Sequence, residues 1–433
     1  MGIILLMVAF VIESALAAYC ITTKSSHARL RSSIRIGALA GFAFLGVASV
    51  IEWNPRWYGL TALLLIWAAL GTLTLIRGKA DQTDYRTGRI VSHALVSLVL
   101  AFICVTPALI FPAHNALATT GAYQVDTLTE TYTDANRVET YNTSGENRKL
   151  NLELWYPRNA TGTYPLIVFS HGTTATRTSN ASLYNELASH GYVVAAIDHT
   201  YQALFTTFPD GHTTWIDMGY VNEFATQDAH SDRQQAAVIF QKWMTTRMGD
   251  INLVIDTILA KANEKGAATP YQLVDPNEIG VAGHSLGGSA ALGIGRMRPD
   301  VGAVISLEAP FMYDIQGTKD GEFVWNQEPY PTPVLNVYSD TSWSHLGEWT
   351  QYAENNALLS NTNPTAFNVY LSGANHLSLT DLSLASPFLT TALSGSQASK
   401  DAVTCLKIVN KVSLAFFDSY LKGKGSFTAA GTY

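Results

Sequence analysis

The pentapeptide GHSLG at residues 283–287 carries the strongest chemical signal in the sequence. It follows a short apolar run at residues 279–282 and precedes a run of small residues that suits a helix. A strand that turns at once into a helix forces the central serine into a strained backbone conformation and leaves no room for a Cβ on either glycine. The spacing therefore predicts a turn that presents the Ser285 hydroxyl above a sheet as a nucleophile.

A serine nucleophile needs a base that takes its proton and an acid that orients the base. After a serine in this strand-to-helix setting, the acid and then the histidine follow along the chain. His376 follows the last predicted strand and is the predicted base, with His345 as the alternative. For the acid, Glu308 ends the strand after the nucleophile and Asp340 ends the next one. Spacing alone does not choose between these two carboxylates.

Two backbone N–H groups must face the carbonyl oxygen that becomes negative during acyl transfer. One is predicted to be that of Leu286, directly after the nucleophile. The other is expected in the loop after the third predicted strand, where Gly172 lets the backbone turn the N–H of Thr173 inward. Neither a metal nor another cofactor is predicted, because no His, Asp or Glu set has a ligand spacing such as H-E-x-x-H.

Short β-rich runs alternate with helical runs from about residue 120 onward, as is typical of a mostly parallel sheet with helices on both faces. The predicted strands are residues 123–132, 150–156, 165–170, 192–198, 279–284, 303–308, 333–339 and 365–371. The predicted helices are residues 182–190, 232–262, 289–298, 345–359 and 402–421. Residues 114–433 are therefore predicted to form one α/β domain.

The segment between Tyr201 and His230 lacks a clear period and is rich in aromatic residues. We predict a cap or pocket wall in which Tyr201, Phe208 and Trp215 bind the acyl part of a substrate. Packing of the same aromatics onto the sheet is nearly as strong an alternative, because aromatic clusters belong more often to a core than to a binding surface.

The remaining apolar residues gather near the N-terminus of the 433-residue chain, which is 47% hydrophobic and only 14% charged. Four apolar runs occupy residues 3–21, 36–50, 57–76 and 90–111. Each is close to the ~20 residues that a bilayer-spanning helix requires. Residues 1–113 are therefore predicted to form an all-α transmembrane bundle that anchors the α/β domain in a lipid bilayer.

Basic residues predict the orientation of this bundle. They follow the first run (Lys24, Arg29, Arg31 and Arg35) and the third run (Arg77, Lys79, Arg86 and Arg89). Cytoplasmic connectors carry such an excess of Lys and Arg, so the α/β domain is expected on the extracytoplasmic side. The first run could instead be a cleaved signal peptide. Gly37 and Gly41 form a GxxxG pair, which suits close packing within the bundle or a homo-oligomer seam.

Charge and cysteine content exclude other classes of protein. Residues 1–113 hold nine Lys/Arg and four Asp/Glu, a net charge of +5, which leaves 18 against 30, or −12, for the rest. An acidic domain without a basic stripe repels polyphosphate, so nucleic-acid binding is not expected. The three cysteines lack CxxC spacing and indicate neither a disulfide framework nor a zinc site.

Four stretches of the α/β region resemble the platelet-activating-factor acetylhydrolase type of α/β-hydrolase, which is related to dienelactone-hydrolase-like esterases. They are YPLIVFSHG (164–172), LASHGYVVAAIDH (187–199), EIGVAGHSLGG (278–288) and NKVSLAF (410–416). The resemblance implies a serine esterase that acts on short or truncated acyl esters without calcium. It favours Glu308 over Asp340 as the acid, although the family usually places Asp there and commonly an apolar residue where this chain has Thr173.

The sequence thus predicts a membrane-anchored hydrolase of small-molecule carboxylic esters. Its catalytic residues would be Ser285, His376 and Glu308, and its oxyanion donors Thr173 and Leu286. The alternative from a different class is a membrane-bundle sensor or transporter-like protein whose outer domain binds a ligand without catalysis.

Overall fold

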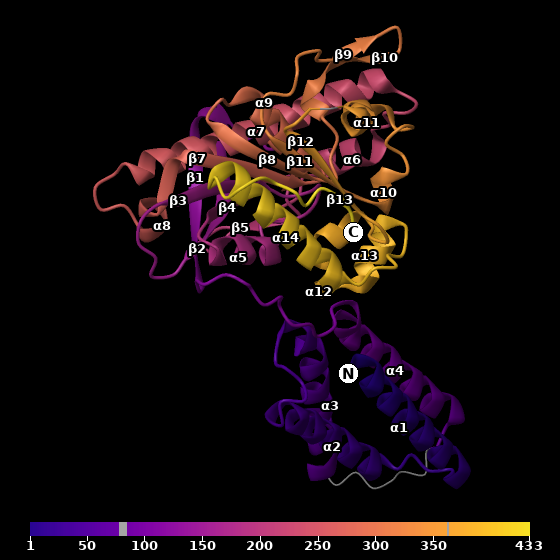
Figure 1. Cartoon of the computed structure of the whole chain (residues 1–433). Helices are drawn as coiled ribbons and strands as arrows, with labels where there is room; N and C mark the ends of the chain where they lie inside the picture. Colours follow the sequence, from indigo (N-terminus) through magenta and orange to yellow (C-terminus); the bar gives the residue numbers. More distant parts are fainter. Residues whose placement is uncertain (78–84, 362) are drawn as a thin grey trace. The chain divides into compact units, whose positions relative to one another are not determined.

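The computed structural model describes residues 1–77, 85–361 and 363–433, so Lys79 lies outside the described residues. The chain divides into two compact units (Figure 1). The first contains Met1–His114 with Ala385–Phe388, and the second contains Asn115–Leu384 with Leu389–Tyr433.

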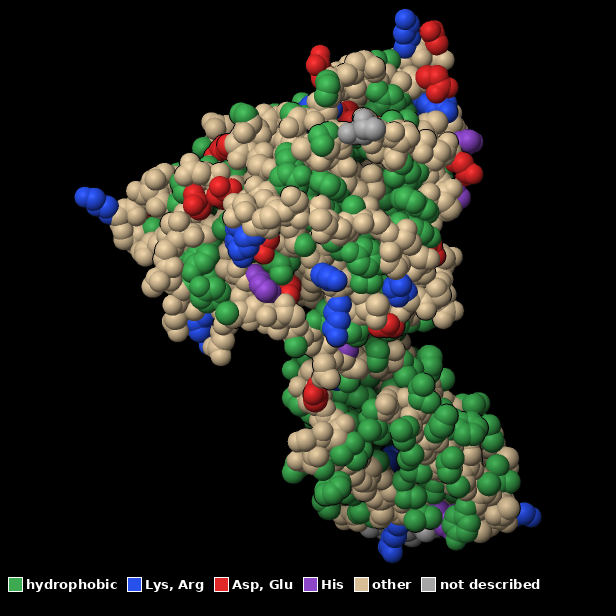
Figure 2. Space-filling view, in the orientation of Figure 1, with side chains coloured by type: hydrophobic (Ala, Val, Ile, Leu, Met, Phe, Trp, Pro, Cys, Tyr) green, Lys and Arg blue, Asp and Glu red, His purple; other side chains and the backbone are tan. Residues whose placement is uncertain are grey.

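Four helices build the first unit: α1 (Gly2–Thr23), α2 (Ala28–Val47), α3 (Tyr58–Ile76) and α4 (Thr87–Ile110), with a 3₁₀ turn at Pro55–Trp57 before α3. α1 packs against α4 and α2 against α3. Each is long and apolar enough to cross a membrane, and only 11% to 28% of the residues in each apolar stretch are buried in the fold. Figure 2 accordingly shows hydrophobic side chains over most of the visible surface of this unit.

Two details of the bundle differ from the prediction. α2 begins at Ala28 rather than at residue 36, so Arg29, Arg31 and Arg35 lie within the helix, because arginine is a good helix former and its long stem carries the charge outward. A Cβ added to Gly37 or Gly41 would meet no atom within 4 Å. The predicted close packing of this GxxxG pair within the bundle is therefore wrong; α2 and α3 approach closely elsewhere, at Gly71.

The second unit contains a nine-stranded sheet in the order β1-β2-β4-β3-β7-β8-β11-β12-β13. These strands are β1 (Val125–Val138), β2 (Asn147–Pro157), β3 (Tyr164–Ser170), β4 (Val193–Asp198), β7 (Val274–His284), β8 (Val301–Leu307), β11 (Val334–Ser339), β12 (Ala366–Leu371) and β13 (Gly431–Thr432). β2 runs antiparallel to β1 and β4, and the other neighbours are parallel. The predicted α/β fold is confirmed, and the two-residue β13 is additional.

Helices cover both faces of this sheet (Figure 1). α5 (Ala181–Ser189) and α14 (Ala402–Leu421) pack on one face, and α7 (Arg233–Ala262) and α9 (Leu286–Met297) pack on the other. Within β3, Ile167 faces the first pair of helices and Val168 faces the second. Because both faces are covered, β3 reads as a continuous apolar run rather than as an alternation.

Shorter elements complete the second unit. Two hairpins are formed by β5 (Phe205–Thr207) with β6 (Thr213–Trp215), and by β9 (Ile315–Lys319) with β10 (Glu322–Trp325). The short helices are α6 (Met218–Thr226), α8 (Thr269–Gln272), α10 (Asp340–Trp343), α11 (Ala353–Ser360), α12 (Leu382–Ala385) and α13 (Pro387–Ser394), of which residues 385–388 belong to the first unit. Three further 3₁₀ turns lie at Met312–Asp314, Thr350–Tyr352 and His376–Leu379.

The predicted helix at residues 345–359 is wrong over its first half, where the chain forms a loop and the 3₁₀ turn Thr350–Tyr352. Gly347 has low helix propensity, and Leu346 and Tyr352 pack together with Tyr338 at the end of β11. That local packing replaces the first turns of a helix.

Candidate active site

Ser285 lies between β7 and α9, with φ 54° and ψ −127°. An added Cβ on Gly283 would lie 2.3 Å from the Gly287 carbonyl carbon, and one on Gly287 would lie 2.0 Å from the Ser170 oxygen. Both positions therefore require glycine. Leu286 is the first residue of α9, so its N–H has no partner within the helix and lies at the positive end of the helix dipole.

Glu308 directly follows β8 and is 1% exposed. Its Oε1 accepts hydrogen bonds from Ser339 Oγ at 2.7 Å and from Ser342 N–H at 3.0 Å. Its Oε2 is buried without a hydrogen-bond partner among the described residues and lies 3.8 Å from His376 Nδ1. Burial raises the pKa of this carboxyl, but His376, Ser339 and Ser342 outweigh burial and hold the pKa below its ordinary value. Glu308 is therefore an ionised group directed at one histidine.

His376 begins a 3₁₀ turn that Asn375 caps. Its backbone N–H donates to Thr341 Oγ1 at 3.1 Å, and its carbonyl accepts from His284 Nε2 at 3.0 Å. The His284 and His376 ring centroids are 4.6 Å apart. The residue next to Ser285 thus holds the backbone of the candidate base, and this contact brings the end of β7 and the loop after β12 together.

The two alternative residues lie elsewhere. Asp340 Oδ1 accepts from Tyr370 O–H at 2.7 Å and from Gly373 N–H at 3.0 Å. His345 lies within 2.8 Å of Glu348 and stacks on Trp349. The structure therefore brings Glu308, and not Asp340, to His376.

The loop after β3 lies directly against Ser285. A Cβ on Gly172 would lie 2.8 Å from His284 Nδ1 and 3.4 Å from Ser285 Cβ. Thr173, Ser285 and Leu286 line one cavity of about 160 Å³. The two candidate oxyanion donors and the candidate nucleophile are therefore brought together.

Aromatic side chains form much of the wall of this cavity, which Glu308 also lines. They are Phe224, Phe240, Trp243, Trp349 and Tyr352. Sequence reasoning missed all five. Phe240 and Trp243 have the helical spacing of ordinary core residues, and Trp349 and Tyr352 fall in a segment predicted to be a helix.

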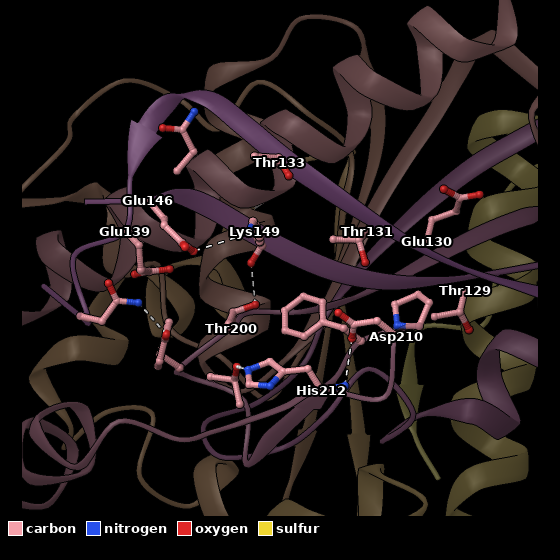
Figure 3. A pocket seen from close by; sticks show the side chains of 16 residues that line it. Thr129, Glu130, Thr131, Thr133, Glu139, Glu146, Lys149, Thr200, Asp210 and His212 are labelled. Atoms are coloured by element: carbon pink, nitrogen blue, oxygen red, sulfur yellow. Dashed lines mark hydrogen bonds and ion pairs between the residues drawn. The ribbon is translucent and has the colours of Figure 1, made fainter. Parts of the chain in front are cut away.

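The aromatics predicted to bind substrate do not line this cavity. Tyr201 and Phe208 line a different, more polar cavity of about 640 Å³ beside β1 (Figure 3). Trp215 is 66% exposed and contacts Phe205 in the β5–β6 hairpin. Within the predicted segment, residues 201–230, none of the residues before α6 lines the Ser285 cavity. Phe224 of α6 is the first residue of the segment that does.

Metal-ligating side chains do not gather at the site. Across the part of the chain that the structure describes, no group of three or more His, Cys, Asp or Glu side chains is placed to hold a metal ion.

The sheet order, the antiparallel second strand and the tight turn at Ser285 define an α/β-hydrolase fold. The family model for platelet-activating factor acetylhydrolase, isoform II, matches residues 147–430. The chain belongs to this family, which confirms the resemblance seen in the sequence. The four N-terminal helices lie outside the matched residues.

Curated relatives match the α/β part of the chain, and a solved structure shares its fold. Platelet-activating factor acetylhydrolase of Cavia porcellus is 24% identical over 273 residues, which cover 60% of this chain and 58% of that protein. A cutinase of Thermobifida alba is 29% identical over 188 residues, covering 43% of this chain and 46% of the cutinase. The chain thus spans about half the length of these relatives. A ferulic acid esterase from Streptomyces cinnamoneus has the same fold, with a TM-score of 0.55, 24% identity, and coverage of 72% of this chain and 94% of the esterase.

Proposed function

We propose that this protein is a serine hydrolase of carboxylic esters. The observation that carries the proposal is the strained Ser285 at the end of β7, together with an ionised Glu308 directed at His376. The proteins to which the chain is similar bear the names of acetylhydrolases, cutinases and an esterase, all of which cleave esters of carboxylic acids.

In the proposed reaction, Ser285 Oγ bonds to the ester carbonyl carbon and its proton passes to His376 Nε2, the ring nitrogen turned away from Glu308. The N–H groups of Thr173 and Leu286 stabilise the negative oxygen of the tetrahedral intermediate. His376 then gives the proton to the leaving alcohol, and an acyl-Ser285 remains. Water attacks this acyl group with His376 again as the base, which releases the acid and restores Ser285.

We infer that the acyl group is short or medium. The cavity at Ser285 measures about 160 Å³, well below the ~300–1,000 Å³ typical of sites for drug-sized ligands. Its wall is largely aromatic, so an apolar acyl chain fits it better than a charged one.

The decisive test replaces Ser285 with alanine. Ser285→Ala should abolish hydrolysis of p-nitrophenyl acetate and labelling by a fluorophosphonate, because loss of a triad nucleophile costs on the order of 10⁶ in turnover. The exposed Ser360 serves as the matched control, and Ser360→Ala should keep both activities. Labelling of another serine in Ser285→Ala would refute the proposal.

We further propose that α1–α4 anchor the protein in a bilayer with the hydrolase unit on the extracytoplasmic side. In Figure 1, α1 ends and α2 begins at the same end of the bundle where α3 ends and α4 begins. The described basic residues Lys24, Arg29, Arg77 and Arg86 lie at these helix ends, as expected for a cytoplasmic side. Protease added to spheroplasts should release an active fragment that starts beyond residue 113. Cleavage only after lysis would refute the orientation.

A further inference from the structure

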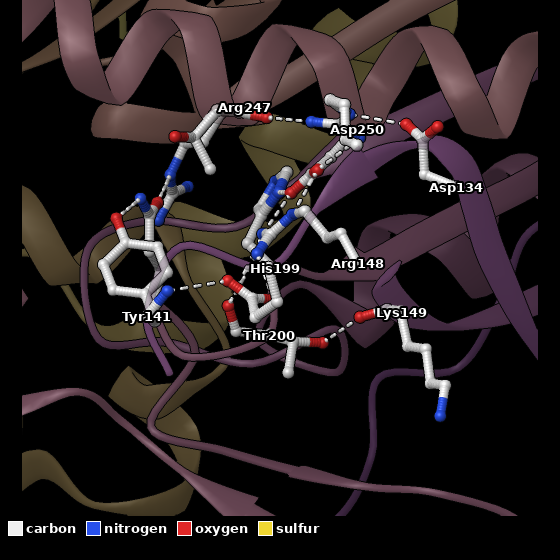
Figure 4. Close-up of polar contacts among 12 residues, drawn as sticks. Asp134, Tyr141, Arg148, Lys149, His199, Thr200, Arg247 and Asp250 are labelled. Atoms are coloured by element: carbon white, nitrogen blue, oxygen red, sulfur yellow. Dashed lines mark hydrogen bonds and ion pairs between the residues drawn. The ribbon is translucent and has the colours of Figure 1, made fainter. Parts of the chain in front are cut away.

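A cluster of fully buried polar side chains lies beneath the loop that carries Thr173. Its members come from segments far apart in the sequence: Arg148 from β2, Ser170 and His171 from the end of β3, His199 after β4, and Arg247 and Asp250 from α7. Arg148 is 3% exposed and the other five are 0% exposed. Figure 4 shows Arg148 and His199 converging on Asp250.

Ser170, His199 and Asp250 form a hydrogen-bonded chain that resembles a catalytic triad. Ser170 Oγ lies 2.8 Å from His199 Nε2, and His199 Nδ1 lies 2.9 Å from Asp250 Oδ2. None of the three reaches solvent, so no substrate can approach Ser170. The hydrogen-bonded series Ser170–His199–Asp250 is therefore not a second nucleophilic site. Its role must lie in positioning the residues around it.

The charges of the cluster are well defined. Burial and the nearby Arg247 lower the pKa of His199 to about 4, so the ring is neutral near pH 7. Although burial opposes ionisation of Asp250, Arg148 holds its pKa below the ordinary value, through bonds of 2.7 and 2.6 Å from Nε and Nη2. Asp250 therefore accepts the Nδ1–H of His199, and His199 Nε2 accepts the hydroxyl of Ser170.

His171 connects the buried cluster to the loop that carries Thr173. Its Nε2 accepts the backbone N–H of His199 at 3.2 Å, so its Nδ1 holds the proton and donates to the Gly172 carbonyl at 2.6 Å. The Gly172–Thr173 peptide is planar and trans, so its C=O and N–H point in opposite directions. Fixing the Gly172 carbonyl against His171 therefore fixes the direction of the Thr173 N–H.

Arg247 holds the preceding peptide. Its Nη1 donates to the His171 carbonyl, and its Nε donates to Gln202 Oε1 at 2.8 Å. No described carboxylate lies within ion-pair distance of this fully buried guanidinium. Burying an unpaired charge costs free energy, so stability alone does not account for an arginine here. The His171 carbonyl that Arg247 holds would lie 2.5 Å from a Cβ on Gly287, in the turn at Ser285, and the Ser170 carbonyl would lie 2.0 Å from it.

We propose that Arg247 and His171 are positioning residues for the oxyanion hole, and that the Ser170–His199–Asp250 chain holds His171 in the tautomer this role requires. The proposal rests on the proposed function, because it takes the Thr173 N–H as an oxyanion donor. It predicts that damage to the cluster weakens binding of the transition state more than binding of the substrate.

The test compares two pairs of variants with a matched control. Arg247→Gln removes the charged clamp and Arg247→Lys keeps a donor. His171→Ala removes the Nδ1 donor, and His171→Asn places an amide N–H near the same position. The control is Arg296→Gln, since Arg296 is also a poorly exposed arginine but pairs with Asp314 at 2.6 Å, away from the loop. For each variant we would measure kcat and KM for p-nitrophenyl acetate, the inhibition constant of a trifluoromethyl ketone, and the melting temperature.

Arg247→Gln and His171→Ala should lower kcat about 10²-fold, as expected for a misplaced oxyanion donor, with little change in KM. The ketone forms an oxyanion on Ser285, so its affinity should fall by a similar factor. Arg247→Lys and His171→Asn should recover part of both losses. Arg296→Gln should lower the melting temperature and leave kcat and ketone affinity near wild type.

Equal losses in the control variant, or an unchanged ketone affinity in Arg247→Gln and His171→Ala, would overturn the proposal. Should these two variants fail to fold, Arg247→Lys and the smaller change Ser170→Ala take their place. A loss of ketone affinity larger than the change in KM would again support the proposal, and an unchanged ketone affinity would overturn it. If Ser285→Ala instead kept the wild-type rate of ester hydrolysis, the proposed function itself would be refuted. Failure of the proposed function and failure of this positioning role are therefore distinguishable.

Discussion

Replacing Glu308 with glutamine tests the proposed acid without changing its shape. Oε1 must remain an acceptor, because Ser339 Oγ and Ser342 N–H both donate to it. The amide –NH₂ of the glutamine therefore takes the place of Oε2 and faces His376 Nδ1, now 3.8 Å from the carboxylate. A donor at that point favours the His376 tautomer with the proton on Nε2, which cannot accept the proton of Ser285.

The expected loss follows from this wrong tautomer. An equivalent Asp→Asn change in a serine protease triad lowers kcat about 10⁴-fold, and at 1.36 kcal/mol per tenfold a loss of that size is about 5 kcal/mol of transition-state stabilisation. We expect a fall of about 10³- to 10⁴-fold in kcat for Glu308→Gln, with KM changed little, because His376 and Glu308 act on the proton rather than on substrate binding.

Steady-state kinetics with p-nitrophenyl acetate measure this loss, and a thermal melt shows whether the variant is folded. Asp340→Asn is the matched control. The Asn oxygen can still accept from Tyr370 O–H and Gly373 N–H, so kcat should stay within about tenfold of wild type. If Asp340→Asn is the more damaging change, the acid follows β11 and the reasoning from the Ser339 and Ser342 hydrogen bonds is refuted.

Two further predictions concern the cavity and the buried histidines. Trp349→Ala should enlarge the Ser285 cavity and raise the ratio of kcat/KM for octanoyl over acetyl esters about tenfold or more, since each methylene in an apolar pocket is worth ~1–3 kcal/mol; an unchanged ratio would place the acyl group elsewhere. The pKa of His199 is depressed to about 4, so its contribution to stability is present above the unfolded-state pKa of ~6.5 and is lost as the pH falls toward 4. That amounts to about 3 kcal/mol at 1.36 kcal/mol per pH unit, and urea unfolding of His199→Gln from pH 7 to pH 4 should show a shallower pH dependence than wild type.

The sequence was informative where the constraint is local. GHSLG predicts its turn because the strain at the serine and the close approach at the two glycines arise within five residues. Strands are equally accessible where they are apolar, since β3 is a continuous apolar run, whereas only the second half of β7, from Ile279, was predicted and its polar first half was missed. The same logic places the four apolar helices, although α2 begins eight residues before its apolar run, at Ala28.

The contacts that select the acid and build the pocket are not local. Glu308 and Asp340 look alike in the sequence, because each is a carboxylate at a strand end. Only the structure shows that Ser339 and Ser342 turn Glu308 toward His376, while Tyr370 holds Asp340 away.

The prediction of which aromatic residues line the cavity was wrong for a related reason. Tyr201, Phe208 and Trp215 stand out because they crowd one irregular segment, yet a pocket is lined by whichever side chains the fold gathers there. Here Phe240 and Trp243 of α7 meet Trp349 and Tyr352 from beyond β11. In the sequence, an aromatic residue at helical spacing looks like an ordinary core residue. In the structure, Phe240 and Trp243 line the Ser285 cavity.

His284 shows how far the organisation of the site depends on the pentapeptide itself. Its Nδ1 would lie only 2.8 Å from a Cβ on Gly172, and its Nε2–H donates to the His376 carbonyl. Burial, with His376 close by, lowers the pKa of His284 to about 3, so the ring stays neutral at the pH at which His376 must accept a proton. A charged ring there would repel the imidazolium that forms during the reaction. His284, the residue before the nucleophile, therefore packs against the oxyanion loop at Gly172 and holds the backbone of the base at His376. Its neutral ring is part of that role.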